Sequence, residues 1–543
     1  MGSMKQEQRF DIADVRDMIP RKLKPWLFIF FVVIIQLSGG VYLAATTHMV
    51  GDTALMQEDI MMAGYASLIG LSLNFSVMFR LKFRFSLRTC LKTSCLMIIV
   101  CNLIIIHTDS FPILVGASFI AGWFRMWGTF ACNSTIQLWI TPNRDMAVWL
   151  SYIYLLVEGA IQLTGITTIY MSVYLNWEYM HWLMIGLVSL VYIMVCLLIR
   201  HYRSMPKLPL FGIDWFGSLL WAIFFFSLTF IFIYGDHYDW FESEYIIGAT
   251  LIGLASLSLN IWRMTFLRHP YLSPIVLTNR RVIKVTILYL LAYILLSPEH
   301  VCEHAYMHEI LGYDSLHQIS INWFVWSGII FGCGFMYVTF AQLRWQYKTM
   351  TIIGFCFIAI YIAYFYFFID YGLDKSMLFI PLFCRGAGIV ILSVCFLVSL
   401  LQAGLPFPLY GQCISMNGYL TAVIGGSMGS AVMGEIMQYT MTKNAMLLSS
   451  EIVATNASIS FIPIEKLYGM VWHHSLIVSI KEVYGWLLII AIALISMLLM
   501  VSSGMIRPSA IHPKWSTIRK EFKNGLKIYR HIKVPWLVNN HRQ

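Results

Sequence analysis

The chain is 543 residues long, with 59% hydrophobic and 12% charged residues and a formal net charge of +10. A soluble globular protein is roughly 45–50% apolar and about 25% charged. The sequence therefore has too little polar surface to cover a water-soluble body of this size, which excludes an ordinary soluble protein. Lipid must cover much of the surface, so we expect an all-α polytopic membrane protein.

Taken in chain order, the sequence begins with a polar segment, 1–25, which lacks the early apolar stretch of a cleavable signal peptide. The first apolar run is therefore expected to remain as a membrane helix. A span needs about 20 mainly apolar residues, and this pattern predicts fourteen membrane helices. They cover roughly 26–49, 60–79, 90–107, 111–140, 146–173, 179–199, 215–235, 244–266, 283–298, 319–341, 349–369, 376–402, 411–441 and 484–506.

The positive charges give an orientation to these helices, because cytoplasmic loops carry an excess of Lys and Arg. With the N-terminus inside, most of the 37 Lys and Arg residues fall in inner segments, including the basic tail 507–543. Both termini are thus predicted to be cytoplasmic. The tail either binds anionic lipid or is a solvated amphipathic segment. The stretch 442–483 is more polar than the spans and is predicted to be a long outer loop.

Four local motifs connect the chain to a known family. The first motif starts at Phe211 and contains Asp214 and Gly217, and the second consists of His269-Pro270 and the following Arg280-Arg281. The third starts at Glu309 and contains Gly312 and Ser315. The fourth starts at Ser415 and contains Asn417, Gly425, Gly426 and Gly429. In this order and at these helix positions, the pattern resembles the major facilitator superfamily, specifically its fourteen-helix drug:proton antiporters of the EmrB/QacA type.

The resemblance implies a particular organisation. A cytoplasmic segment, 1–25, would precede a six-helix bundle, 26–200, two additional central helices with their linkers, 201–282, and a second six-helix bundle, 283–506. It also implies a conformational-switch segment between the second and third helices. The basic residues Arg80, Arg84 and Arg88 lie there, although the Asp and Gly of the family's pattern are absent.

The same resemblance implies a function. Members are secondary active transporters that export hydrophobic or amphipathic small molecules by alternating access, usually in exchange for protons, and confer multidrug resistance by efflux. It further implies a bacterial inner (cell) membrane, and a periplasmic adaptor with an outer-membrane channel that would dock on 442–483. The alternatives are a lipid or lysolipid transporter of the same fold, a membrane enzyme, and a receptor or scaffold that does not transport.

Charged residues inside the predicted spans are candidates for proton coupling. A charge at the bilayer centre costs about 2.5–3.5 kcal/mol on insertion scales, so such residues usually face a cavity. Glu158 is the predicted proton carrier with Arg125 as its partner, unless the two form a static pair that only fixes packing. Arg385 and Glu435 are the further candidates, and Arg385 alternatively extends to the membrane surface.

A substrate cavity would need aromatic and polar side chains within the membrane. The candidates are Trp123, Trp127, Gln162, Trp323, Trp326 and Asn417, and the alternative for the tryptophans is that they face lipid. A cluster of His, Cys and Glu at 299–309 lacks the spacing of a closed metal site. No nucleotide-binding loop or catalytic signature stands out, so we expect no enzyme activity, cofactor, metal or nucleic-acid partner.

Overall fold

The computed structural model describes residues 12, 14–39, 41–201, 210–267, 269–450, 463–500, 507–508 and 520, and most of the predicted tail 507–543 lies outside them. These residues are helical throughout, with one isolated bridge between Val15 and Ile199 and no sheet among them. Twelve of the helices in this part of the chain are long and apolar enough to cross a membrane.

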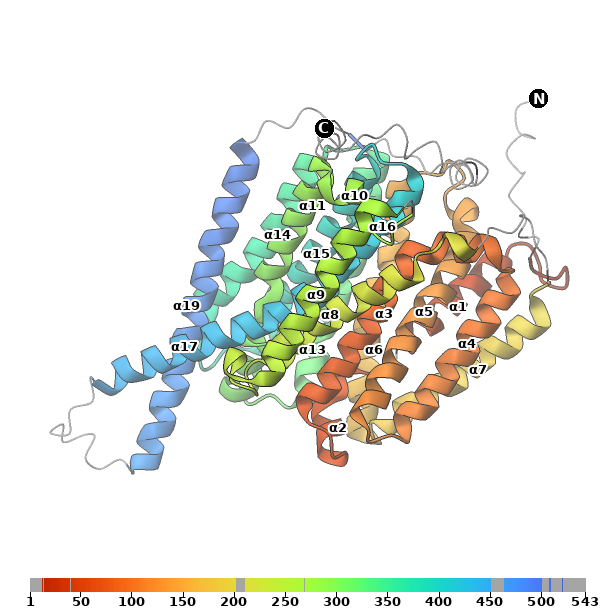
Figure 1. Ribbon diagram of the computed structural model, residues 1–543. Helices are drawn as coiled ribbons and strands as arrows, with labels where there is room; N and C mark the ends of the chain where they lie inside the picture. The colour runs from red at the N-terminus through yellow and green to blue at the C-terminus, as the bar shows by residue number, and fades with distance from the viewer. Residues whose placement is uncertain are drawn as a thin grey trace, which may run out of the picture.

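The first bundle contains six long helical elements on one side of the molecule (Figure 1). They are α1 (Lys24–Leu37), α3 (Gln57–Arg84), α4 (Leu87–Ile106), α5 (Phe111–Ile140), α6 (Met146–Tyr174) and α7 (Glu178–Leu198). Between α1 and α3 lie the short elements η1 (Leu43–Ala45) and α2 (Thr46–Asp52).

The predicted single helix 26–49 is wrong in its second half. Helix α1 ends at Leu37, where the Ser38 hydroxyl donates to the carbonyl of Ile35 at 2.8 Å. Ser38 and Gly39 follow, and glycine has little helix propensity because its backbone loses more conformational freedom on folding. The chain therefore leaves the helix at this point, and the resulting break lies against the candidate site described below.

Two further helices, α8 (Trp215–Tyr234) and α9 (Glu244–Phe266), run diagonally in front of both bundles (Figure 1). The Asp214 carboxylate caps α8 by accepting from the Gly217 amide at 2.9 Å, and it also pairs with Arg263 of α9 at 2.8 Å. The two helices are thus tied together at one end. Helix α8 packs on α3 of the first bundle and on the π-helix η8 (Leu420–Met428), which belongs to a second bundle.

The second bundle is built from more numerous and more interrupted elements. They are α10 (Pro274–Thr278), α11 (Arg280–Leu296), η4 (Ser297–Glu299), α12 (Cys302–Ala305), η5 (Tyr306–Ile310), α13 (Ser315–Phe335), η6 (Met336–Gln342), α14 (Tyr347–Phe368), η7 (Lys375–Leu378), α15 (Phe379–Leu401), α16 (Phe407–Tyr419), η8 (Leu420–Met428), α17 (Gly429–Ser450) and α19 (Ile464–Met500). The bundles meet where α3 packs on α16 and α6 packs on α13.

The number of spans differs from the prediction for two reasons. Helix α1, with 14 residues, is shorter than a span, and the tract 407–450, which contains the π-helix η8, is also not among the twelve. The count of fourteen and the orientation of the termini therefore stay predictions.

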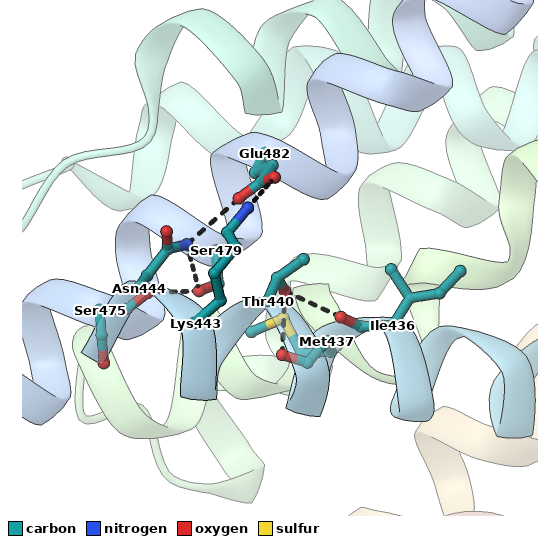
Figure 2. Close-up of polar contacts among 8 residues, drawn as sticks. All are labelled: Ile436, Met437, Thr440, Lys443, Asn444, Ser475, Ser479 and Glu482. Carbon is teal, nitrogen blue, oxygen red and sulfur yellow. Dashed lines mark hydrogen bonds and ion pairs between the residues drawn. The ribbon is translucent and has the colours of Figure 1, made fainter. Parts of the chain in front are cut away.

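The predicted outer loop 442–483 is corrected by the structure, because its described part is helical. Helix α17 continues to Ser450 and α19 begins at Ile464, while 451–462 lie outside the described residues. Lys443 pairs with Glu482 at 2.5 Å, and the Asn444 amide donates to the Ser479 hydroxyl at 2.9 Å (Figure 2).

Polar side chains therefore hold α17 against α19 where the sequence reads as a connection. With 37 residues, α19 is about 55 Å long, more than a hydrocarbon core of about 30 Å. We infer that one end of this helix pair projects beyond the membrane.

Candidate functional site

Two adjacent chambers, which share part of their lining, lie between the bundles. The first, which we call the apolar chamber, has a volume of about 250 Å³, and its lining includes Phe75, Phe79 and Phe130 from the first bundle and Phe407 from the second. The second, the polar chamber, has a volume of about 480 Å³ and is lined in part by Tyr42, Gln162, Thr168, Glu299 and His300. The residues that line both chambers are Gln36, Leu68, Arg125, Glu158, Ile161, Tyr293 and Thr421.

Arg125 projects from α5 to the junction of the two chambers, and only 8% of the residue is exposed. Its guanidinium lies against Gly39, where any Cβ would collide with it, so the break after α1 makes room for this side chain. Within the described part of the chain, Arg125 makes no ion pair, and its Nε has no hydrogen-bond partner. A buried cation without a counter-ion is costly, so this position is unusual.

Glu158 projects from α6 to the same junction and is partly buried. No hydrogen bond or ion pair involves its carboxylate among the described residues, and Arg125 is not paired with it. Neither the predicted partnership of Arg125 with Glu158 nor the alternative static pair is therefore present in this conformation. Three tyrosines, Tyr154, Tyr289 and Tyr293, share the chamber wall with Glu158. Their hydroxyl groups add polar atoms to the wall around Glu158.

Arg385 of α15 is placed differently from its prediction, because it lines neither chamber. It is 4% exposed, and its guanidinium donates to both oxygens of Glu303 at 2.7 and 2.8 Å and pairs with Glu299 at 3.1 Å. The Tyr361 hydroxyl donates to Glu303 at 2.9 Å and lies 3.2 Å from the Tyr484 hydroxyl. The side chain is thus compensated inside the second bundle and does not extend to the membrane surface.

Glu435 of α17 is exposed and lines neither chamber. Its carboxylate accepts a hydrogen bond from Trp240 Nε1 at 2.6 Å, in the connection between α8 and α9. This contact joins the additional helices to the second bundle. Nothing in the surroundings of Glu435 connects it to the cavity between the bundles.

Two of the predicted cavity residues do line the chambers. Gln162 faces the polar chamber, and Asn417 faces the apolar chamber, where its amide donates to the Cys413 carbonyl at 2.9 Å. The predicted tryptophans lie outside both chambers: Trp123 and Trp127 pack inside the first bundle, Trp323 is 40% exposed, and Trp326 lies against Gly159. These four serve packing or face outward, since helix rotation rather than residue type decides which side chains reach a cavity.

The predicted switch segment is shorter than expected. Helix α3 continues through Arg84, and α4 begins at Leu87, so only Phe85 and Ser86 connect them. Arg88 donates to the Cys196 carbonyl of α7 at 2.8 Å, and Arg80 lies against Gly212. The basic residues therefore hold neighbouring segments of the first bundle, and their role in switching stays a prediction.

An ion pair joins the two bundles at the end of the molecule opposite to Glu299. Asp145 caps α6 by accepting from the Ala147 amide at 3.0 Å, and its other oxygen pairs with Arg344, which precedes α14. Arg344 also donates to the Pro508 carbonyl at 3.0 Å. Because Asp145 belongs to the first bundle and Arg344 to the second, this contact must break if the bundles separate at that end.

Sequence reasoning missed the two carboxylates of the Arg385 cluster. Glu299 and Glu303 were assigned to a loop with weak metal-binding character, yet η4 and α12 place them one helical turn apart. The i, i+4 spacing of two glutamates next to an apolar run was the available signal, because such residues share one helix face. Among the described residues, no group of three or more His, Cys, Asp or Glu side chains is arranged to hold a metal.

No protein-family model matches the sequence, and no curated protein matches it. Among solved structures, the chain is similar to the crystal structure of an auto-inhibited POT family peptide transporter, with a TM-score of 0.53 and 12% sequence identity. The match covers 91% of this chain and 99% of that chain. At this identity the similarity shows the fold alone. The chain thus shares the overall fold of that transporter and, with twelve apolar helices among its described residues, is an integral membrane protein.

Proposed function

We propose that this protein is a secondary active transporter that carries hydrophobic or amphipathic small molecules across the membrane by alternating access. The observation that supports it is the placement of Arg125 and Glu158. Both are unpaired within the described chain, and both line two adjacent chambers between the bundles. A charged group inside the membrane usually marks a substrate or ion pathway, and rocking of two bundles around such a site gives alternating access.

We propose further that Glu158 is the proton-binding group. Its carboxylate lines both chambers, so it can exchange a proton with whichever membrane face its chamber opens to. The absence of an ion pair leaves its charge free to change during the transport cycle. Asp145 and Arg344 would then form the contact that opens and closes one end of the cavity.

Export in exchange for protons, a bacterial inner-membrane location and docking of a periplasmic adaptor are proposals that come from the resemblance to the drug:proton antiporters. The projecting end of the α17–α19 pair is the surface that would meet such an adaptor. A lipid or lysolipid substrate is the second candidate, favoured by the phenylalanine-rich lining of the apolar chamber, which suits an acyl chain.

The test is transport of a hydrophobic fluorescent dye by the full chain in proteoliposomes under an imposed pH gradient. The wild type should move dye in a gradient-dependent manner, and Glu158→Gln should lose that dependence. Glu309→Gln is the matched control, because Glu309 lies outside both chambers and, among the described residues, pairs with His308 alone. Dye movement that is equal in wild type, Glu158→Gln and empty vesicles would contradict the proposal, and lysolipid would then be tested in the same vesicles.

A further inference from the structure

The buried and partly buried arginines of this protein differ in how their charge is compensated. Arg385 has two carboxylate partners, Arg263 pairs with Asp214, and Arg344 pairs with Asp145. Arg125 is more deeply buried than Arg263 and Arg344 and nearly as deeply as Arg385, yet it has no carboxylate partner in the described part of the chain. Carboxylates thus neutralise the charge of these three arginines, whereas Arg125, at the junction of the chambers, has no such partner among the described residues.

The surroundings of Arg125 contain further unsatisfied polar groups. The Tyr42 hydroxyl and the Thr168 hydroxyl are buried and lack hydrogen-bond partners, and both residues line the polar chamber beside Arg125. Both hydroxyls can donate a hydrogen bond to an anion. A guanidinium presents parallel N–H donors that match a carboxylate, sulfonate or phosphate.

The wall on the other side of Arg125 is apolar. Phe75, Phe79, Phe130 and Phe407 line the apolar chamber, which adjoins the junction. A molecule that spans the junction would therefore place a charged end at Arg125 and a hydrophobic body among aromatic rings. Ligand sites commonly combine a mostly apolar lining with a few polar groups that fix orientation.

From this arrangement we propose that the transported molecule is an amphipathic organic anion whose anionic headgroup binds the Arg125 guanidinium. Tyr42 and Thr168 are positioned at the headgroup end, and the apolar chamber receives the hydrophobic body. The inference rests on the proposed transport function and specifies its substrate class. Glu158 keeps its separate role as the proton-binding group.

The test measures binding of three fluorescent probes of similar length to the full chain in lipid nanodiscs. The probes are dansylaminoundecanoic acid, its uncharged methyl ester, and a dansyl-labelled undecyl trimethylammonium cation. The acid should bind at least about tenfold more tightly than the ester, because a charge-assisted hydrogen bond contributes about that factor. Arg125→Gln should remove this preference, and Arg125→Lys should restore part of it.

Two controls separate this proposal from a folding defect. Lys375→Gln removes one positive charge far from the chambers, where Lys375 donates to Ser320, and it should bind the acid like the wild type. The ester reports whether Arg125→Gln keeps its apolar chamber, since its weak binding should not change. Equal binding of acid and ester by the wild type, or an unchanged preference in Arg125→Gln, would overturn the proposal, as would tighter binding of the cation.

Glu158→Gln distinguishes this inference from the proposed function. This variant should bind the acid at least as tightly as the wild type, because removing a neighbouring negative charge cannot weaken attraction of an anion. It should nevertheless lose gradient-dependent transport. If the acid binds in an Arg125-dependent way but the protein transports nothing, only the proposed transport function is refuted. If the protein transports a hydrophobic cation but does not bind the acid, only the proposed substrate class is refuted.

Discussion

The Arg385 cluster allows one stability prediction to be worked out in detail. Glu303→Gln removes the carboxylate that accepts two hydrogen bonds from Arg385, but Glu299 remains 3.1 Å from the same guanidinium. Losing the charged hydrogen bonds should cost about 1.5–3 kcal/mol. Removing both carboxylates should cost about 3–5 kcal/mol, because the double variant leaves a buried and unpaired cation. That the double variant should be less stable than Glu303→Gln follows from the geometry alone.

The assay is unfolding of the purified protein in one detergent, with Glu309→Gln as the matched control. Glu309 is exposed and pairs with His308 in the part of the chain that the structure describes, so its neutralisation should change stability by less than about 1 kcal/mol. Tyr361→Phe should lie between control and Glu303→Gln, since it removes one hydrogen bond to Glu303. If the double variant were no less stable than Glu303→Gln, Glu299 would not compensate Arg385 and the reasoning would be refuted.

Three further predictions concern movement and packing. Asp145→Asn removes the ion pair with Arg344 that joins the bundles, and this pair should contribute about 0.2–1 kcal/mol. Distances between spin labels placed across that end of the bundles should therefore shift toward the separated state. An unchanged distance distribution would argue against a closing contact. Gly425→Leu should reduce transport at normal expression, because even its Cβ would lie 2.5 Å from the Tyr293 ring; full transport would show that the chamber wall adapts. Cysteines introduced by Asn444→Cys and Ser479→Cys should crosslink on oxidation, and a failure to crosslink would contradict the α17–α19 packing in Figure 2.

The sequence predicted the positions of most helices because long apolar runs are a strong signal that depends on no distant residue. Helix α5 (Phe111–Ile140) matches its predicted limits, and α9 does as well. The exceptions are local. Gly39 ends the first helix early, and the polar residues of 442–483 read as a loop although they form contacts between two helices. Composition measures how polar a segment is, but polar groups can be satisfied by a neighbouring helix as well as by water.

The site was only partly predictable. Arg125 and Glu158 were identified because a charge inside an apolar run is conspicuous, and both do line the cavity. Their lack of pairing could not be predicted, since it depends on how α5 and α6 are rotated and on the space that Gly39 leaves. The partners of Arg385 were missed for the same reason: Glu303 lies 82 residues away in sequence and reaches it only through packing of the second bundle.

The most direct test of the account is whether the junction of the chambers is reached from both membrane faces. Ile161 lines both chambers one turn from Glu158, so Ile161→Cys places a reporter there and leaves the charged residues intact. In sealed vesicles, a membrane-impermeant thiol reagent should label this cysteine from either face, faster than it labels the parent protein, and the amphipathic acid probe should slow both reactions. Labelling from one face only would contradict alternating access at this site.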